Sequence, residues 1–234
     1  AMAQLDDAIT RGGDIVLNVD ATDDCPHYLA LELDNVKVGP SPDWAQKQLR
    51  AIGLQPINNV VDATNLVLHE FGNPLHAFDK DQICGNQIRV RKATQGESFT
   101  TLDGQARTLD AHDLVIADRD KPMCLAGVYG GAESGVSDST TKVVLEAAWF
   151  HPVTVRKTAK RHTLSTDASF RFERGVDPNM VRNAAARCVH LLEDMRCALF
   201  DDSRRPALCD AFAPEYSVCG DTREQALLNL QQLN

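Results

Sequence analysis

Strand patterns and helix patterns occupy separate stretches of this chain. Between residues 88 and 150, short segments with strand character follow one another, and Asp103-Gly104 supplies a strong hairpin turn signal among them. Two helical patterns, the first from Ser41 to Gly53 and the second from about Val60 to Gly72, precede that stretch, and further helical patterns follow it. Two more strand patterns, 15–20 and 28–34, precede the first helix. This distribution predicts an α+β fold in which mixed, largely antiparallel sheets pack with helices.

The two helices before the strand-rich stretch have recognisable ends. In the first, Ser41 is the predicted N-cap, because its hydroxyl can accept from a free backbone amide of the first turn. The second is predicted from about Val60 to Phe71, with Asn59 as its cap and Gly72 as the left-handed residue that closes it. A tight glycine–asparagine–proline loop then presents His76.

The ordered body is predicted to end with two more helices. One starts near Pro152, and the other runs from Asp177-Pro178 to about Met195. We therefore predict one domain over residues 1–195 and an extension of unclear role over 196–234, in which Arg223–Leu233 is typical of a short helix.

Composition narrows the possible partners. No apolar run approaches the roughly 18 residues that a membrane span needs, so no membrane partner is expected. The net charge is −9, which argues against a DNA-binding domain or one that grips a nucleic-acid backbone unaided. The most obvious basic cluster consists of Arg156, Lys157, Lys160 and Arg161. A nucleic acid held elsewhere could still deliver one end into a pocket here.

The cysteines favour a reducing compartment. There are seven, at scattered positions, and no two form a CxxC pair. An odd, scattered set is better explained by free thiols in the cytoplasm than by disulfides or a zinc site. We expect a cytoplasmic protein with no metal and no cofactor in this domain.

A first group of candidate site residues surrounds the second helix and the loop after it. Thr64 and Asn65 lie in the helix, and His76 follows the proline loop. A neutral histidine can donate from one ring nitrogen and accept at the other, while Asn and Thr add donors and acceptors of defined geometry. The alternative is that Thr64 and Asn65 brace the loop backbone and that His76 is a satisfied structural histidine.

A glycine-rich stretch, residues 127–141, forms the second candidate. Gly127 and Gly130 allow a ligand to approach the main chain closely. The stretch has neither the dinucleotide fingerprint GxGxxG nor the Gly-Lys-Ser/Thr of a phosphate loop. The alternative is a sharp turn between strands.

Glu146 is the single carboxylate in the apolar strand pattern 143–150. By alternation it shares a face with Val144 and Ala148, as in a pocket wall with small residues. The alternative is a solvent-facing acid, since unpaired burial of a charge is costly.

The last candidate stretch, 165–178, contains the small residues Thr166 and Ala168. Its charged side chains, Arg171, Glu173 and Arg174, are better explained by a salt-bridged structural loop. Neither a GxSxG elbow nor a paired-carboxylate spacing occurs in the chain.

Long strings in this order resemble one known family. CPHYLA, VKVGPSPDWAQKQLRAIGLQPINNVVDATN, GNPLHAFD, GVYGGAESGVSDSTT and TDASFRFERGVDP are similar to the central editing domain of the bacterial phenylalanyl-tRNA synthetase beta subunit. The resemblance covers about Val19 to about Leu192. It implies a single editing-type domain that hydrolyses mischarged tyrosyl-tRNA(Phe) through attack of a water on the aminoacyl ester. ATP and Mg are then expected only at the synthesis site of the whole enzyme.

The same resemblance implies roles for individual residues. Asn65 and His76, with Thr64 beside them, match the catalytic set that contacts the adenosine end of the tRNA. Glu146 matches the carboxylate that receives the tyrosine hydroxyl. The remaining matches are to residues that bind the amino acid, Gly127 and Gly130 through close backbone approach and Thr166 and Ala168 on the opposite wall.

The expected partners are the tRNA(Phe) acceptor end, tyrosine and the synthetase alpha subunit. Residues 196–234 do not resemble the family's usual continuation, and its other modules are missing. We therefore expect either an excised fragment or a free-standing relative. The alternative functions are a non-catalytic module that binds tRNA ends or amino acids, and a free-standing deacylase that acts in trans.

Overall fold

The computed structural model describes residues 13–195, and these form an α+β fold with largely antiparallel sheets, as predicted. A five-stranded sheet has the order β1-β4-β7-β8-β9, in which only the β1–β4 pair is parallel. Its strands are β1 (Val16–Val19), β4 (Gln87–Lys92), β7 (Leu114–Ala117), β8 (Pro122–Leu125) and β9 (Tyr129–Gly130).

A three-stranded antiparallel sheet has β10 (Val143–Trp149) at its centre. β2 (His27–Leu33) pairs with one edge of β10, and β3 (Leu75–Asp79) pairs with the other. A separate hairpin joins β5 (Ser98–Thr100) to β6 (Ala106–Thr108), and the Asp103-Gly104 turn lies between them as predicted. Gly104 has a φ of 76°, the left-handed conformation that this turn needs.

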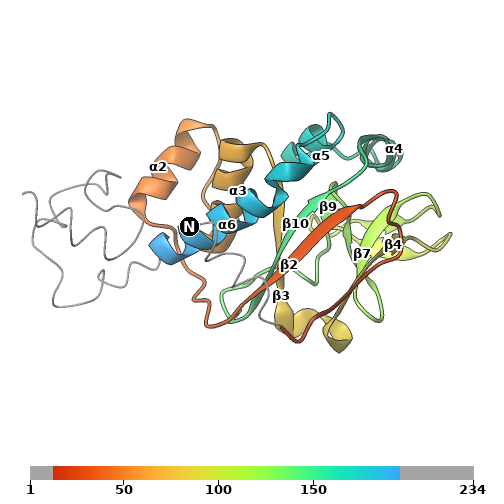
Figure 1. Cartoon of the computed structure of the whole chain (residues 1–234), viewed down its shortest axis with the longest axis horizontal. Coiled ribbons are helices and arrows are strands. Elements are labelled where there is room, and N and C mark those ends of the chain that lie inside the picture. Colours follow the sequence, from red (N-terminus) through yellow and green to blue (C-terminus); the bar gives the residue numbers. More distant parts are fainter. Residues whose placement is uncertain (1–12, 196–234) are drawn as a thin grey trace, which may run out of the picture.

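The two faces of the three-stranded sheet cover two different cores. One face packs against α2 (Asp43–Ala51), α3 (Asn59–Phe71) and α6 (Val181–Met195), and contributes Val143 and Leu145 to their apolar core. The other face turns toward the five-stranded sheet, where Val144 and Ala148 join Ile116. In Figure 1, α2, α3 and α6 therefore lie on one side of β2, β10 and β3, and β4 and β7 lie on the other.

The predicted helix ends are partly correct. α3 ends at Gly72 with a φ of 70°, as predicted. The cap assignments were wrong by one residue each: Asn58 caps α3 by accepting from the Val61 amide, and α2 begins after Pro42. Ser41 is not a cap because its hydroxyl instead donates to buried Asp62, a residue of α3.

The remaining helices follow the strands. α4 (Pro152–His162) begins at the predicted proline, and α5 (Asp167–Phe172) is a short helix after it. A 3₁₀ turn, η3 (Pro178–Met180), leads into α6, so the predicted Asp177-Pro178 start is confirmed. Two further 3₁₀ turns, η1 (Lys80–Gln82) and η2 (Cys84–Asn86), connect β3 to β4.

Within residues 13–195, no helix is both long and apolar enough to cross a bilayer. The predicted extension 196–234 and its helix at Arg223–Leu233 lie outside the described residues.

Candidate functional site

Glu146 and His76 lie directly opposite each other in the three-stranded sheet. β10 and β3 are antiparallel, and their register pairs Glu146 with His76. Directly opposed residues of an antiparallel pair share one face of the sheet. Val144 and Ala148 lie on that face and are fully buried, as predicted by alternation. The face is the one that turns toward the five-stranded sheet.

Glu146 is a buried acid without a partner. Its residue exposure is 5%, so the alternative of a solvent-facing acid is wrong. Within residues 13–195, no hydrogen bond or ion pair reaches its carboxyl group. Burial raises the pKa of Glu146 to about 8, because the charged form loses its hydration without compensation. A carboxyl group held this way is ready to bond a polar group that enters the site.

His76 is also left without a full set of partners. Its Nε2 atom is buried and makes no hydrogen bond among the described residues. Its ring lies edge-on to Phe78, with 4.6 Å between the ring centroids. Burial lowers the pKa of His76 to about 4, so the imidazole is neutral at pH 7. This does not fit the alternative of a satisfied structural histidine.

Gly130 lies against His76 from the opposite sheet. A Cβ atom at Gly130 would stand 3.1 Å from His76 Cε1 and 2.9 Å from Leu102 Cδ1. The absent side chain is therefore what lets the two sheets approach at this point. Leu102 follows β5, its amide donates to the Gly130 carbonyl, and it is 54% exposed. Sequence reasoning missed Leu102, although the neighbouring Asp103-Gly104 signal had placed a hairpin tip there.

Gly127 has a different environment from Gly130. It has a φ of 69° in the turn between β8 and β9. A Cβ atom there would meet Phe150 and Phe172 at 3.0 Å and Val155 at 3.2 Å, all of them residues of the apolar core. These contacts fit the alternative of a turn glycine that packs against the core.

Thr166 and Ala168 lie at the start of α5. Thr166 caps this helix by accepting from the Ser169 amide, and its hydroxyl donates to the Val128 carbonyl over 2.9 Å. That bond ties the helix to the residue two positions before Gly130. Ala168 is partly buried against the core between the sheets. The structure thus connects the α5 start to the turn that leads into β9, the strand of Gly130.

Thr64 and Asn65 are less closely connected to the other candidates. The Thr64 hydroxyl donates to the Val61 carbonyl in its own helix over 2.7 Å, which fits the alternative of a backbone brace. Asn65 is partly exposed. In the described part of the chain, no hydrogen bond joins Thr64 or Asn65 to His76.

The charged side chains after α5 bond one another and nearby groups. Arg174 pairs with Glu173 over 2.5 Å and stacks on Phe170, with 3.5 Å from its guanidinium carbon to the ring centroid. Arg171 instead contacts the ring of His69. Of the three charged side chains predicted to form a salt-bridged loop, Glu173 and Arg174 pair with each other and Arg171 does not join them.

The basic cluster on α4 is smaller than the sequence indicated. Arg161 pairs with the buried Asp113, so its charge is already compensated. Arg156, Lys157 and Lys160 are exposed. Three exposed charges are a small footprint for a nucleic-acid backbone.

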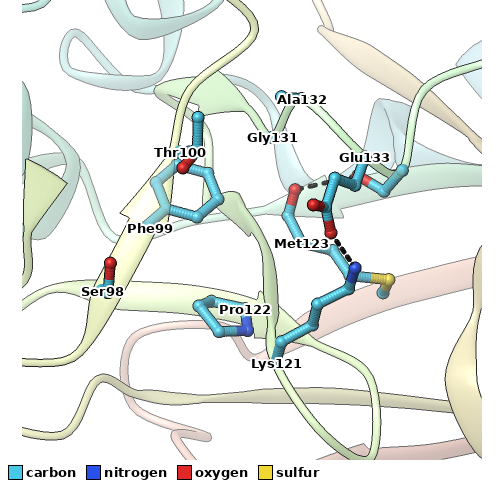
Figure 2. A pocket seen from close by; sticks show the side chains of 10 residues that line it. Ser98, Phe99, Thr100, Lys121, Pro122, Met123, Gly131, Ala132 and Glu133 are labelled. Atoms are coloured by element: carbon cyan, nitrogen blue, oxygen red, sulfur yellow. Dashed lines mark hydrogen bonds and ion pairs between the residues drawn. The ribbon is translucent and has the colours of Figure 1, made fainter. Parts of the chain in front are cut away.

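Two surface concavities lie away from Glu146 and His76. One has a volume of about 140 Å³ and lies between Ser98–Thr100, Lys121–Met123 and residues 131–134. In Figure 2 the Lys121 amine and the Glu133 carboxylate bond to each other at this pocket. The other, of about 420 Å³, has Arg89 and Lys92 among its lining residues, and each of these pairs with an aspartate. Neither combines unpaired polar groups as the sheet interface does.

No group of three potential metal ligands occurs within residues 13–195. The four cysteines in that range, Cys25, Cys84, Cys124 and Cys188, are free thiols.

Comparisons with known proteins identify relatives of this domain. The B3/4 domain family matches residues 24–197. The phenylalanine–tRNA ligase beta subunit of Bacteroides fragilis is 52% identical over 167 residues, which are 71% of this chain and 20% of that protein. The corresponding subunit of Carboxydothermus hydrogenoformans is 47% identical over 206 residues, which are 88% of this chain and 26% of that protein. The chain thus spans about a fifth to a quarter of the length of these relatives.

A solved structure was also found. An N-terminal fragment of the phenylalanyl-tRNA synthetase beta-subunit from Pyrococcus horikoshii aligns with 64% of this chain and 50% of that chain. Its sequence identity is 14% and the TM-score is 0.45, so this likeness is too distant to add to the sequence matches.

Proposed function

The chain belongs to the B3/4 domain family, and on that premise we propose that it is the editing domain of a phenylalanine–tRNA ligase beta subunit. In this proposal it hydrolyses tyrosine that has been wrongly esterified to tRNA(Phe). The observation that carries the proposal is the pair formed by Glu146 and His76. Glu146 is buried, His76 is half-buried with a buried Nε2 atom, and the two stand opposite each other in the sheet. Among the described residues, no hydrogen bond reaches the Glu146 carboxyl group or His76 Nε2.

Glu146 supplies the choice of amino acid. A synthesis pocket shaped for phenylalanine rejects an isostere with one extra hydroxyl by only about a hundredfold. A second pocket can favour tyrosine if its carboxyl group bonds that hydroxyl. When phenylalanine enters instead, Glu146 stays buried and unpaired, so phenylalanine binds less favourably than tyrosine by about 1–3 kcal/mol.

His76 acts by orientation in this mechanism. With a pKa of about 4, it is a weak base, and general-base catalysis by it is inefficient at pH 7. Its neutral ring can still hold the attacking water or the terminal ribose in position. An aminoacyl ester is activated, so correct placement of a water and of oxyanion contacts can supply the acceleration without a protein nucleophile.

The remaining residues close the pocket and receive the tRNA end. Gly130 allows close backbone approach, Leu102 covers that point, and Thr166 and Ala168 form the facing wall. In this proposal Asn65 contacts the adenosine end, and Thr64 beside it braces the helix. In this proposal the chain is part of a larger cytoplasmic enzyme. Other parts of that enzyme hold the body of the tRNA, contact the alpha subunit, and bind ATP and Mg for synthesis.

A deacylation assay on this 234-residue chain tests the proposal. We expect tyrosyl-tRNA(Phe) to be hydrolysed faster than phenylalanyl-tRNA(Phe), and Glu146→Ala to remove that preference while the fold is kept. The rate should be low at physiological salt, because few exposed basic residues hold the tRNA body. Tyrosine binding without hydrolysis at any enzyme concentration would instead support the non-catalytic module.

Filter binding separates the remaining alternative. We expect tRNA(Phe) to bind weakly and with a steep dependence on salt. Sub-micromolar affinity at physiological salt would support a free-standing deacylase that acts in trans.

A further inference from the structure

Tyr28 is a third polar residue on the face that carries Glu146 and His76. It lies in β2, and the register pairs it with Ala148 of β10, two positions from Glu146. Residues two apart in a strand share a face, so each of the three strands contributes one polar side chain to the same surface. A diagonal neighbour such as Tyr28 remains within reach of Glu146 because its side chain is long.

The Tyr28 hydroxyl is buried and has no hydrogen-bond partner among the described residues. Burial raises the pKa of Tyr28, and the charge of Glu146 raises it further, so the phenol stays protonated and remains a donor. A buried hydroxyl normally finds a partner, and an unpaired one costs free energy. This unpaired hydroxyl lies on the same sheet face as the carboxyl group of Glu146, which also has no partner in the described part of the chain.

The nearby thiols do not provide the missing partner. Cys25 and Cys124 both belong to the core against which Tyr28 packs. The Cys25 thiol donates to the His27 carbonyl over 3.6 Å, and the Cys124 thiol donates to the Tyr129 carbonyl over 3.3 Å. Both thiol protons are therefore already used by the backbone.

The position of Cys124 also links Tyr28 to the glycine of the site. Cys124 of β8 is the register partner of Gly130 of β9, so their side-chain positions share a face. Tyr28 packs against the same core between the two sheets as Cys124. The unpaired groups of Tyr28, Glu146 and His76 therefore come from the sheet face that turns toward β8 and β9.

We propose that Tyr28 is a specificity-determining residue whose hydroxyl donates a hydrogen bond to the phenolic oxygen of a bound tyrosine. This inference rests on the proposed function. The phenol of the ligand has one proton and a lone pair available for bonding. It donates a hydrogen bond to a carboxyl oxygen of Glu146 and accepts one from Tyr28, so each protein group gains a partner from the same phenol. Bound phenylalanine leaves both protein groups without a partner, so each of them contributes to the preference for tyrosine.

Calorimetry with free L-tyrosine and free L-phenylalanine tests this on the whole chain. In Tyr28→Phe, we expect tyrosine affinity to fall about three- to tenfold, the loss of one neutral hydrogen bond. Phenylalanine affinity should stay the same or rise, because one buried unpaired group has been removed. A purely structural role would lower both affinities together and leave their ratio unchanged.

Tyr129→Phe is the matched control. Tyr129 is the neighbour of Gly130 in β9, so its side chain points to the other face of that strand. The same loss of a hydroxyl there should leave the ratio of the two affinities unchanged. A double variant, Tyr28→Phe with Glu146→Gln, should lose less than the sum of the two single losses, because both act on one phenol.

The outcomes separate the inference from the function on which it rests. If the unmodified chain does not prefer tyrosine to phenylalanine, both the proposed pocket and the role of Tyr28 are overturned. If it prefers tyrosine and folded Tyr28→Phe retains the full preference, only the role of Tyr28 is overturned. A preference reduced in Tyr28→Phe and intact in Tyr129→Phe supports it.

Discussion

Two buried carboxyl groups, Asp62 and Glu146, lie on opposite sides of the three-stranded sheet and differ in their hydrogen-bond partners. On the helical side, Asp62 is fully buried and accepts from the Ser41 hydroxyl over 2.5 Å and from the Ile57 amide over 2.8 Å. On the other side, Glu146 is nearly as buried and has no partner within residues 13–195. A buried carboxyl group is thus satisfied at Asp62 and left without a partner at Glu146.

The contrast separates a buried carboxyl group that stabilises the fold from one that has no hydrogen-bond partner in the described residues. Asp62 stabilises the junction between the α2 start and α3, because its charge is compensated by two donors. Glu146 destabilises the unliganded fold, because its burial has no compensation. Unpaired polar groups that persist in a packed interior are typical of functional sites.

The largest expected difference concerns the stability of two variants. Asp62→Ala should lower the free energy of unfolding by about 3 kcal/mol, since two hydrogen bonds to a charged acceptor are lost. Glu146→Gln should leave it unchanged or raise it at pH 8, where the native carboxylate is costly. Urea unfolding measures both. Equal losses in the two variants would remove the contrast between the two regions.

Two glycines extend the comparison to the backbone. Gly127→Ala should cost about 2 kcal/mol of stability, because the residue has a positive φ and its new Cβ meets Phe150 and Phe172 at 3.0 Å. Gly130→Ala should cost less, since exposed Leu102 can move aside. Its main effect should be on tyrosine binding, and Gly130→Trp should abolish that binding in a folded protein. Thermal unfolding and calorimetry separate the two effects.

The pH dependence of stability sharpens the comparison further. Burial raises the pKa of Glu146 from 4.5 in the reference state to about 8 in the folded state. The free energy of unfolding therefore has its full value below pH 4.5, where Glu146 is protonated in both states, and it falls as the pH rises through 8. His76 has the opposite effect, because burial lowers its pKa from 6.5 to about 4. Its contribution to the free energy of unfolding is fully present above pH 6.5 and is lost as the pH falls through 4.

Between pH 6.5 and 8, only the Glu146 effect of these two remains. Stability should then fall with pH by up to about 1.4 kcal/mol per pH unit. Glu146→Gln should remove this slope while the contributions of other groups persist. Urea unfolding of the unmodified chain and of Glu146→Gln at several pH values measures this slope. If the free energy of unfolding depends on pH in the same way in both proteins, Glu146 does not have a raised pKa in the folded state.

The smallest expected effect concerns the charges of α4. Alanine at Arg156, Lys157 or Lys160 should leave stability unchanged and should lower the slope of log affinity for tRNA against log salt by about 0.7–0.9 each, if each contacts a phosphate. Arg161→Ala should instead reduce stability, because it leaves buried Asp113 short of a partner. Filter binding at several salt concentrations, with unfolding curves as the control, tests this division.

Features with local causes were predicted correctly from the sequence. The α3 end at Gly72, the β5–β6 hairpin and the proline starts of α4 and η3 follow from φ preferences that neighbouring residues largely determine. The cap at Ser41 was predicted wrongly because a tertiary partner, Asp62, competes for its hydroxyl. Local propensity cannot include a partner that is 21 residues away in the chain.

For the candidate site too, some features followed from the sequence and others only from the tertiary structure. The sequence by itself determined which residue types are available, the alternation that places Val144 and Ala148 beside Glu146, and the resemblance that selects Glu146 and His76. It could not decide whether Glu146 faces solvent, nor that Tyr28 and Leu102 belong to the same region. Only the tertiary structure decided these points, because they depend on strand register. β2, β3 and β10 are far apart in the chain, and a shift of one residue would turn every side chain to the opposite face.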